Sequence, residues 1–190
     1  MKCIICNSLS FYIICKSCQK EYLKPTISKR ILSTGLIVYS FYPYSQIEKF
    51  IKTKHTYKGF AIYKILAKNS FESFAKSFEY ERKVFALAVD DKVKEDYAHT
   101  AILTKALKSK YIKPVFNTLR AKNSVSYSAK SLEFRLKNPR DFSYTFKRDI
   151  DVILVDDIIT TGTTLNEAYT LLKKQDVNTL FALTLADARQ

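Results

Sequence analysis

The sequence predicts an α/β domain, in which a mainly parallel β-sheet is flanked by helices on both faces. Two unbroken apolar runs, over residues 84–89 and 152–155, have the composition of strands that are buried on both faces. Segments with helical spacing of apolar residues alternate with these runs, and such alternation is typical of parallel sheets. The chain has 190 residues, of which 47% are hydrophobic, enough for one medium domain with a small additional segment.

The expected elements follow in order along the chain. Residues 1–24 carry all four cysteines and form a head segment, which Pro25 separates from a larger unit over residues 25–190. β-Branched and aromatic residues over 31–42, interrupted by Gly35, predict a strand or a hairpin. The remaining expected elements are helices over 44–54, 60–80, 97–110 and 165–174 and strands over 84–89, 114–117, 152–155 and 180–185, while 118–148 is polar, basic and without firm periodicity.

The charge balance is strongly basic. The chain has 32 Lys and Arg against 18 Asp and Glu, which gives a formal net charge of +14. Residues 150–190 hold three basic and six acidic side chains, so residues 1–149 hold the other 29 basic and 12 acidic ones. A basic body favours a polyanionic partner such as nucleic acid, because neutralised phosphates release their counterions on binding. A lysine-rich coding bias at solvated positions is the alternative explanation.

Targeting signals are absent from the sequence pattern. The N-terminus lacks the apolar run of a signal peptide, and the apolar stretches have the length of strands, so no transmembrane segment is expected. Four cysteines confined to the first 18 residues do not fit a secreted disulfide scaffold. We therefore expect a cytoplasmic protein.

The segment over residues 152–164, VILVDDIITTGTT, has the properties of a ligand site. Its apolar start predicts a buried strand that leads to the carboxyl edge of the sheet, where open α/β folds bind ligands. Two adjacent carboxylates, Asp156 and Asp157, are expected at the end of this strand. They add nothing to a core, but they suit the vicinal hydroxyls of a ribose as hydrogen-bond acceptors.

Four threonines and a glycine then lead directly into a predicted helix. Backbone N–H groups at the start of a helix bind phosphate, and threonine hydroxyls add further donors. Glycine allows the backbone to approach the anion closely. An ordinary helix cap would account for one threonine only, and a Walker loop is excluded because no Gly-Lys-Ser/Thr follows. The expected phosphate ligands are Thr160, Thr161, Gly162, Thr163 and Thr164.

The cysteines have the spacing C-x2-C-x8-C-x2-C. Two such pairs form two knuckles, each of which presents two thiolates to one tetrahedral zinc ion. A site with four thiolates has no open position, so the expected Zn²⁺ is structural and stabilises a short head that lacks a core. A degenerate site or a redox pair is the alternative. The expected ligands are Cys3, Cys6, Cys15 and Cys18.

Residues 152–164 resemble the thirteen-residue ribose-phosphate motif of type I phosphoribosyltransferases. The resemblance implies a type I phosphoribosyltransferase-like fold over residues 25–190. It also implies that Asp156 and Asp157 hold the ribose hydroxyls of phosphoribosyl pyrophosphate, that residues 160–164 wrap its 5-phosphate, and that Mg²⁺ accompanies the pyrophosphate. A zinc ribbon over residues 1–24 before this motif resembles the layout of the ComF family, phosphoribosyltransferase-like proteins linked to DNA uptake in natural competence.

Weaker correspondences lie elsewhere in the chain. The ComF pattern includes an R-x-x-N element in the mobile hood, and Arg135 and Asn138 match it. The pattern also includes R-G-F-N-Q, from which this chain departs with DYAH at residues 96–99. The short loop after residues 84–89 corresponds to the pyrophosphate position of the type I fold. The residues assigned by resemblance are Asp90, Asp91 and Lys92 for pyrophosphate, and Lys130, Lys137 and Arg140, beside Arg135 and Asn138, for the hood or nucleic acid.

Three functions are compatible with these features. The first is a ComF-like competence protein, which binds phosphoribosyl pyrophosphate and single-stranded DNA and assists DNA uptake, together with competence proteins at the inner membrane. The second is a nucleobase salvage phosphoribosyltransferase, for which no base pocket is identified and the acceptor is open. The third is a non-catalytic sensor of phosphoribosyl pyrophosphate. The cysteine head and the basic body favour the first, whether or not the protein is an enzyme.

Overall fold

The fold is described from a computed structural model, which describes residues 1–89, 98–123, 133 and 140–190. Its main sheet has six strands in the order β1-β2-β8-β7-β3-β4. Neighbouring strands from β2 to β4 pair in parallel, and only β1 is antiparallel, at one edge. The strands are β1 (Ser28–Ile31), β2 (Ile37–Pro43), β3 (Val84–Ala88), β4 (Ile112–Val115), β7 (Asp151–Ile159) and β8 (Asn178–Asp187).

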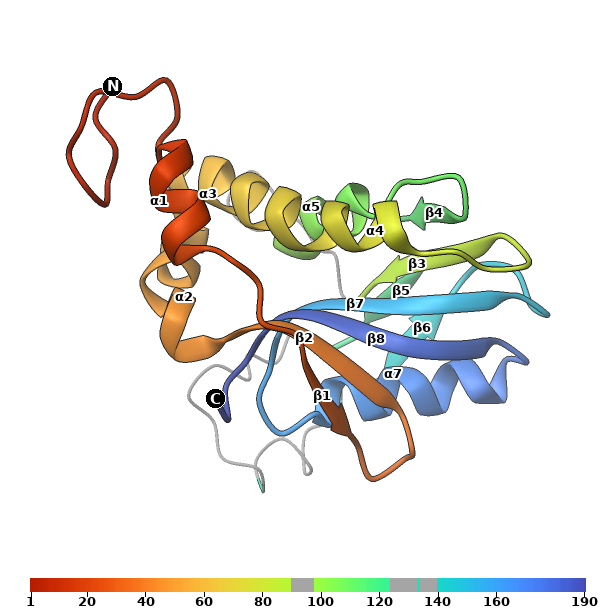
Figure 1. Cartoon of the computed structure of the whole chain (residues 1–190). Coiled ribbons are helices and arrows are strands. Elements are labelled where there is room, and N and C mark those ends of the chain that lie inside the picture. The colour runs from red at the N-terminus through yellow and green to blue at the C-terminus, as the bar shows by residue number, and fades with distance from the viewer. Residues whose placement is uncertain (90–97, 124–132, 134–139) are drawn as a thin grey trace.

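Helices cover both faces of this sheet. Figure 1 shows α3, α4 and α5 along one face and α7 along the other. The predicted α/β class, with a mainly parallel sheet flanked by helices, is therefore confirmed. The helices are α1 (Lys16–Tyr22), α2 (Tyr44–Ile51), α3 (Tyr57–Ala67), α4 (Ser73–Ser77), α5 (His99–Ala106) and α7 (Thr163–Lys174), with a 3₁₀ turn η1 (Lys52–His55) and a π-helical turn η2 (Lys68–Glu72).

The central strand β7 explains why the core has two halves. Successive side chains of a strand point to opposite faces of the sheet. Val152 and Leu154 accordingly pack in the apolar cluster that contains Leu165 of α7. Ile153 packs in the other cluster, which contains Leu103 of α5. The unbroken apolar run is thus needed because both faces of β7 are buried.

The cysteine head packs against the α/β body. Ile14 and Leu23 are buried in the same cluster as Phe41 of β2. The hydroxyl of Tyr42 donates a hydrogen bond of 2.9 Å to the carbonyl oxygen of Leu23. In Figure 1 the head lies at the end of the molecule where α1 and α2 meet. The head segment is therefore anchored through α1 and the chain that follows it.

Several elements differ from the sequence-based expectations. The segment over 31–42, predicted as a strand or a hairpin, belongs to a hairpin whose first strand already begins at Ser28, and the predicted helix over 60–80 is divided by the π-helical turn η2. β7 extends beyond the apolar run to Ile159, because β8 continues beside it and pairs Asp156 with Thr184. The short antiparallel strands β5 (Leu119–Ala121) and β6 (Phe142–Tyr144) were not expected, since three residues are too few for a periodic signal.

Among the described residues, every helix is too short or too polar to cross a membrane.

Candidate functional site

The turn between β7 and α7 depends on a glycine in a left-handed conformation. Gly162 has φ 84° and occupies the N-cap position of α7. Its carbonyl oxygen accepts the N–H of Asn166 at 2.9 Å, the first bond of the helix. A Cβ atom at Gly162 would lie 2.8 Å from Cδ2 of Leu32. Glycine is required here both for the backbone conformation and for the close approach of the β1–β2 hairpin.

Arg30, in strand β1, holds the backbone of this turn from behind. Its guanidinium donates to the carbonyl oxygen of Thr160 at 2.8 Å and to that of Thr161 at 3.3 Å. The same guanidinium lies 3.4 Å from the carboxylate of Asp187, and both side chains are largely buried. In a trans peptide the C=O and the following N–H point in opposite directions. The amides of Thr161 and Gly162 therefore face away from Arg30.

Two threonine hydroxyls meet at the start of α7. Oγ1 of Thr161 and Oγ1 of Thr163 lie 2.9 Å apart, and the N–H of Thr163 points at Oγ1 of Thr161 at 3.4 Å. Both residues are half-buried, as are Thr160 and Thr164. Backbone amides, hydroxyls and the positive end of the helix dipole therefore occur together in one short turn, which is the donor set that a phosphate group needs.

The two aspartates lie just before this turn, within the last part of β7. Asp156 and Asp157 are half-buried. Oδ1 of Asp156 accepts the N–H of Asp157, and Oδ1 of Asp157 accepts the N–H of Ile158, each at 2.8 Å. Burial, and next the charge of Asp157, raise the pKa of Asp156 well above its usual range, while the positive charge of Arg140 acts in the opposite direction. A carboxylate that is so disfavoured in the folded protein is typical of functional sites.

A cleft of about 790 Å³ lies beside the turn. It includes Thr161 and Thr163 together with the outer face of α7 and the start of β6. Glu167 of α7 accepts the backbone N–H of Arg140 at 2.7 Å, so the chain that leads into β6 is fixed to α7. On the other side, Asn166 bonds to Ser33 of the hairpin turn at 3.1 Å. The cleft is therefore walled by segments that are far apart in sequence.

The remaining predicted site residues divide into two groups. Arg140 is described, and its charge acts on Asp156 as stated above. Arg30 and Asp187 were missed by the sequence reasoning, because a single arginine in an edge strand gives no sign of its partners 130 residues away. The predicted residues outside the described part of the chain are Asp90, Asp91, Lys92, Lys130, Arg135, Lys137 and Asn138.

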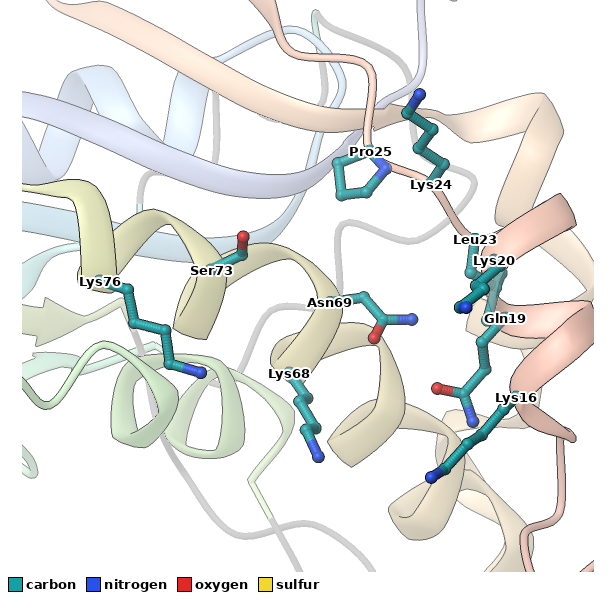
Figure 2. A pocket seen from close by; sticks show the side chains of 10 residues that line it. All are labelled: Lys16, Gln19, Lys20, Leu23, Lys24, Pro25, Lys68, Asn69, Ser73 and Lys76. Carbon is teal, nitrogen blue, oxygen red and sulfur yellow. The ribbon is translucent and has the colours of Figure 1, made fainter.

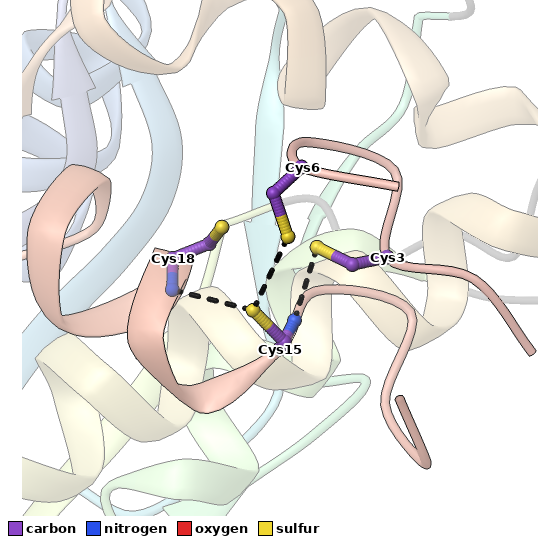
Figure 3. A group of neighbouring side chains, drawn as sticks. All are labelled: Cys3, Cys6, Cys15 and Cys18. Atoms are coloured by element: carbon purple, nitrogen blue, oxygen red, sulfur yellow. Dashed lines mark hydrogen bonds between the residues drawn. The ribbon is translucent and has the colours of Figure 1, made fainter. Parts of the chain in front are cut away.

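The four cysteines form one cluster, as the spacing predicted (Figure 3). All four sulfur atoms lie within 4.8 Å of one another, and those of Cys6 and Cys15 are 3.7 Å apart. Zn–S bonds of about 2.3 Å place the sulfurs of a tetrahedral site about 3.8 Å apart. None of the four is in a disulfide. The residues therefore fit a tetrahedral metal ion such as Zn²⁺.

The protonation of these thiols supports the same fit. Hydrogen bonds, the largest from the N–H of Cys15 at 3.3 Å, lower the pKa of Cys3 to about 6. The Ser8 hydroxyl lowers the pKa of Cys6. Burial, and next the neighbouring thiols, raise the pKa of Cys18. Cys3 and Cys6 thus favour the thiolate form, whereas burial and the neighbouring thiols oppose a thiolate at Cys18. A bound cation would stabilise all of the thiolates.

Comparison with known protein families gives one match. The family model described as "Phosphoribosyl transferase domain" matches residues 103–190, which is 88 of the 190 residues. The matched part includes β7, the turn and α7. Together with the sheet described above, the match gives this chain a phosphoribosyltransferase-like fold, and the predicted fold is confirmed. Comparison with curated proteins gives no match.

Several solved structures are similar to this chain at low identity. A hypoxanthine phosphoribosyltransferase from Staphylococcus aureus is 19% identical, with a TM-score of 0.41, over 66% of this chain and 62% of that one. An adenine phosphoribosyltransferase is 16% identical, with a TM-score of 0.41, over 88% of each chain. An orotate phosphoribosyltransferase from Aeropyrum pernix is 16% identical, with a TM-score of 0.37, over 90% of this chain and 80% of that one. The match thus spans less than two thirds of the Staphylococcus aureus enzyme.

Proposed function

We propose that this protein binds phosphoribosyl pyrophosphate at the turn between β7 and α7. One observation carries the proposal. Arg30 holds the carbonyl groups of the turn, so that the backbone amides of Thr161 and Gly162 face the opposite side, and two half-buried aspartates lie just before the turn. In this proposal residues 160–164 surround the 5-phosphate, and Asp156 and Asp157 accept hydrogen bonds from the ribose hydroxyls. Two adjacent carboxylates can accept hydrogen bonds from both hydroxyls of a vicinal diol, and a ligand that lacks the diol cannot donate them, which makes the site specific.

The pyrophosphate end of the ligand is assigned to the segment after β3. Asp90, Asp91 and Lys92 are proposed to face it, the two aspartates through Mg²⁺ and the lysine directly. Mg²⁺ prefers carboxylate and phosphate oxygens, and it would neutralise charge on the pyrophosphate. The hood is assigned to Lys130, Arg135, Lys137, Asn138 and Arg140. Of these, Arg140 has support from its electrostatic effect on Asp156.

We further propose a ComF-like role for the whole chain. Residues 1–24 would form a zinc ribbon and residues 25–190 the phosphoribosyltransferase-like domain, in a cytoplasmic protein that binds single-stranded DNA and assists its uptake at the inner membrane, with competence proteins as partners. The support is the cysteine cluster, the net charge of +14 and the ribose-phosphate motif in one chain. Binding of phosphoribosyl pyrophosphate and binding of DNA are separate parts of this proposal, and an experiment that disproves one of them leaves the other untouched.

A nucleobase salvage reaction is the second candidate, and a non-catalytic sensor the third. The match of residues 103–190 to a phosphoribosyl transferase domain favours retained chemistry. A salvage enzyme would release pyrophosphate when a nucleobase is added to protein, Mg²⁺ and phosphoribosyl pyrophosphate. A non-catalytic sensor would bind the ligand and release none, and a competence protein is compatible with either result.

Calorimetric titration of the protein with phosphoribosyl pyrophosphate and Mg²⁺ tests the main proposal. The double variant Asp156→Asn/Asp157→Asn should lose at least about 100-fold in affinity, because hydrogen bonds to charged groups contribute about 1.5–3 kcal/mol each. The matched control is Asp149→Asn/Asp176→Asn, which removes the same charge from exposed positions before β7 and after α7. Their positive φ values of 51° and 56° suit asparagine equally well. Equal affinity of both double variants would overturn the site assignment.

A further inference from the structure

A second cleft, separate from the turn after β7, lies between the cysteine head and the helices of the body. Its volume is about 540 Å³. One wall is α1 with the chain that follows it, and the other wall is the π-helical turn η2 with the start of α4. Figure 2 shows side chains from both walls around the same hollow. The lining residues are Lys16, Gln19, Lys20, Leu23, Lys24, Pro25, Lys68, Asn69, Ser73 and Lys76, which we call the lysine groove.

The lysine groove has an unusual charge. Five of its ten lining residues are lysines and none is acidic. All five lysines are exposed. Among the described residues, only Lys76 of α4 has an acidic partner, Glu72 at the end of η2, at 2.7 Å. Like charges that line the same groove repel one another. An anion in the groove would remove the repulsion.

The spacing of the lysines follows the two walls. Lys16 and Lys20 are one turn apart on α1, about 6 Å along the helix axis. Lys68 is opposite them in η2 (Figure 2). A π-helical turn inside a longer helix is uncommon and is frequent at functional sites. A row of cations on each side of an open groove suits a chain of phosphates better than a single small anion.

Neutral donors lie between the two rows. In Figure 2 the amide of Asn69 extends from η2 toward α1. Ser73 adds an exposed hydroxyl at the start of α4. Gln19, in contrast, donates its amide to the carbonyl oxygen of Ile14 at 2.7 Å and so holds the head together. The groove therefore offers hydrogen bonds to phosphate oxygens in addition to charge.

Exposed aromatic rings continue from the groove onto the head. Tyr12 is 49% exposed, and Nζ of Lys16 lies 6.0 Å from the centre of its ring. Its neighbour Phe11 is 100% exposed. A basic groove beside exposed aromatic rings is the combination that single-stranded nucleic acids require, because unpaired bases stack on such rings. The bases of a duplex are already stacked on one another, and an acidic peptide has no bases, so neither would stack on these rings.

We propose that the lysine groove binds the phosphate backbone of single-stranded DNA, with Lys16, Lys20 and Lys68 as the main contacts and Tyr12 as a stacking surface for a base. This inference gives a location to the DNA-binding part of the proposed function. It does not depend on the phosphoribosyl pyrophosphate part, because the groove and the turn share no residue. The groove is also next to the cysteine cluster, because Cys18 is a buried residue of α1, the helix that carries Lys16 and Lys20, and its N–H donates to Sγ of Cys15.

The test is fluorescence anisotropy with a labelled oligothymidine of about 20 nucleotides, longer than the about 4–16 nucleotides of a typical single-strand site. The groove variant is Lys16→Gln/Lys20→Gln/Lys68→Gln. We expect it to bind at least about tenfold more weakly and to lower the slope of log affinity against log salt by about 2, since each single-strand phosphate contact contributes about 0.7. Tyr12→Ala should weaken binding while leaving the salt slope unchanged.

The matched control removes three charges elsewhere. Lys113→Gln/Lys147→Gln/Lys173→Gln changes exposed lysines outside both clefts. An equal loss in this control, or full binding by the groove variant, would overturn the proposal. Competition for the labelled probe gives a second test. The competitors are duplex DNA, oligouridine, polyglutamate and anionic vesicles, each at the same concentration of charge. If any of them displaced the probe as well as unlabelled oligothymidine does, the proposal would also be overturned. Titration of the same variants with phosphoribosyl pyrophosphate separates the two functions: the groove variant should bind it like the unaltered protein.

Discussion

The guanidinium of Arg30 lies 2.8 Å from the carbonyl oxygen of Thr160, although the two residues are 130 positions apart. This contact joins the edge strand β1 to the turn after the central strand β7. It matters because the carbonyl groups of the turn are held on the side of Arg30, so that the amides are presented on the other side. The hairpin thereby contributes to the geometry of the candidate phosphate site through Arg30.

Replacing Arg30 with lysine tests this positioning role. Lysine keeps the charge beside Asp187, but it lacks the planar fork that reaches two carbonyl oxygens. We expect affinity for phosphoribosyl pyrophosphate to fall about tenfold, which corresponds to about 1.4 kcal/mol and thus to about one hydrogen bond. Arg148→Lys, at an exposed arginine that bonds to Gln175, is the control. Titration calorimetry of both variants measures the effect, and equal affinities would show that Arg30 has no positioning role.

Replacing Asp156 with asparagine should stabilise the free protein. Burial and Asp157 raise the pKa of Asp156 in the folded state, so ionisation above the unfolded value of about 3.9 opposes folding. The free energy of unfolding therefore decreases as the pH rises from this value through the folded pKa. Asparagine does not ionise, so the variant avoids this loss. Thermal unfolding at neutral pH should show a higher Tm, by about 2–4 °C per kcal/mol. At pH 3 the difference should disappear. A Tm at pH 7 equal to or below that of the unaltered protein would contradict the account.

Gly162→Ala should damage both the turn and the fold. The left-handed φ of 84° costs a non-glycine residue about 1–2 kcal/mol, and the new Cβ would lie 2.8 Å from Leu32. Affinity for the ligand should fall and Tm should decrease. Gly35→Ala is the control, because Gly35 has a similar φ of 86° but no atom within 4 Å of its Cβ position. If both variants kept full affinity, the turn would not be a ligand site.

Removal of the metal should unfold the head before the body. Purified protein should contain about one zinc per chain, since the four sulfurs lie within 4.8 Å of one another. Chelation, or Cys18→Ser, should lower Tm and abolish binding of oligothymidine, while binding of phosphoribosyl pyrophosphate persists. Elemental analysis and thermal unfolding measure these outcomes. Zinc-free protein with an unchanged Tm would contradict a structural metal, and Ser17→Ala is the control on the same helix.

The sequence predicts the parts of this molecule that depend on local patterns. The apolar run of β7 and the amphipathic face of α7 have strong periodic signals, and the cysteine spacing determines a cluster directly. The extension of β7 past Asp156 is not local, because it depends on pairing with β8. The same is true of Arg30, whose partners come from the turn and from Asp187 at the end of β8.

The lysine groove illustrates the same limit. The basic composition predicts an anionic partner, but scattered lysines carry no information about where they meet. Lys16 and Lys68 are 52 positions apart in sequence and come together only because α1 packs near the π-helical turn. Short strands such as β5 and β6 escape prediction for a related reason, since their stability depends on each other and not on their own residues.

A crystal structure of the protein with phosphoribosyl pyrophosphate and Mg²⁺ tests the central claim most directly. The account predicts oxygen atoms of the 5-phosphate about 2.7–3.2 Å from the backbone amides of residues 161–164. It also predicts the two ribose hydroxyls at the carboxylates of Asp156 and Asp157. A ligand whose phosphate lies in the lysine groove, or a structure in which the turn after β7 contacts no phosphate, would contradict it.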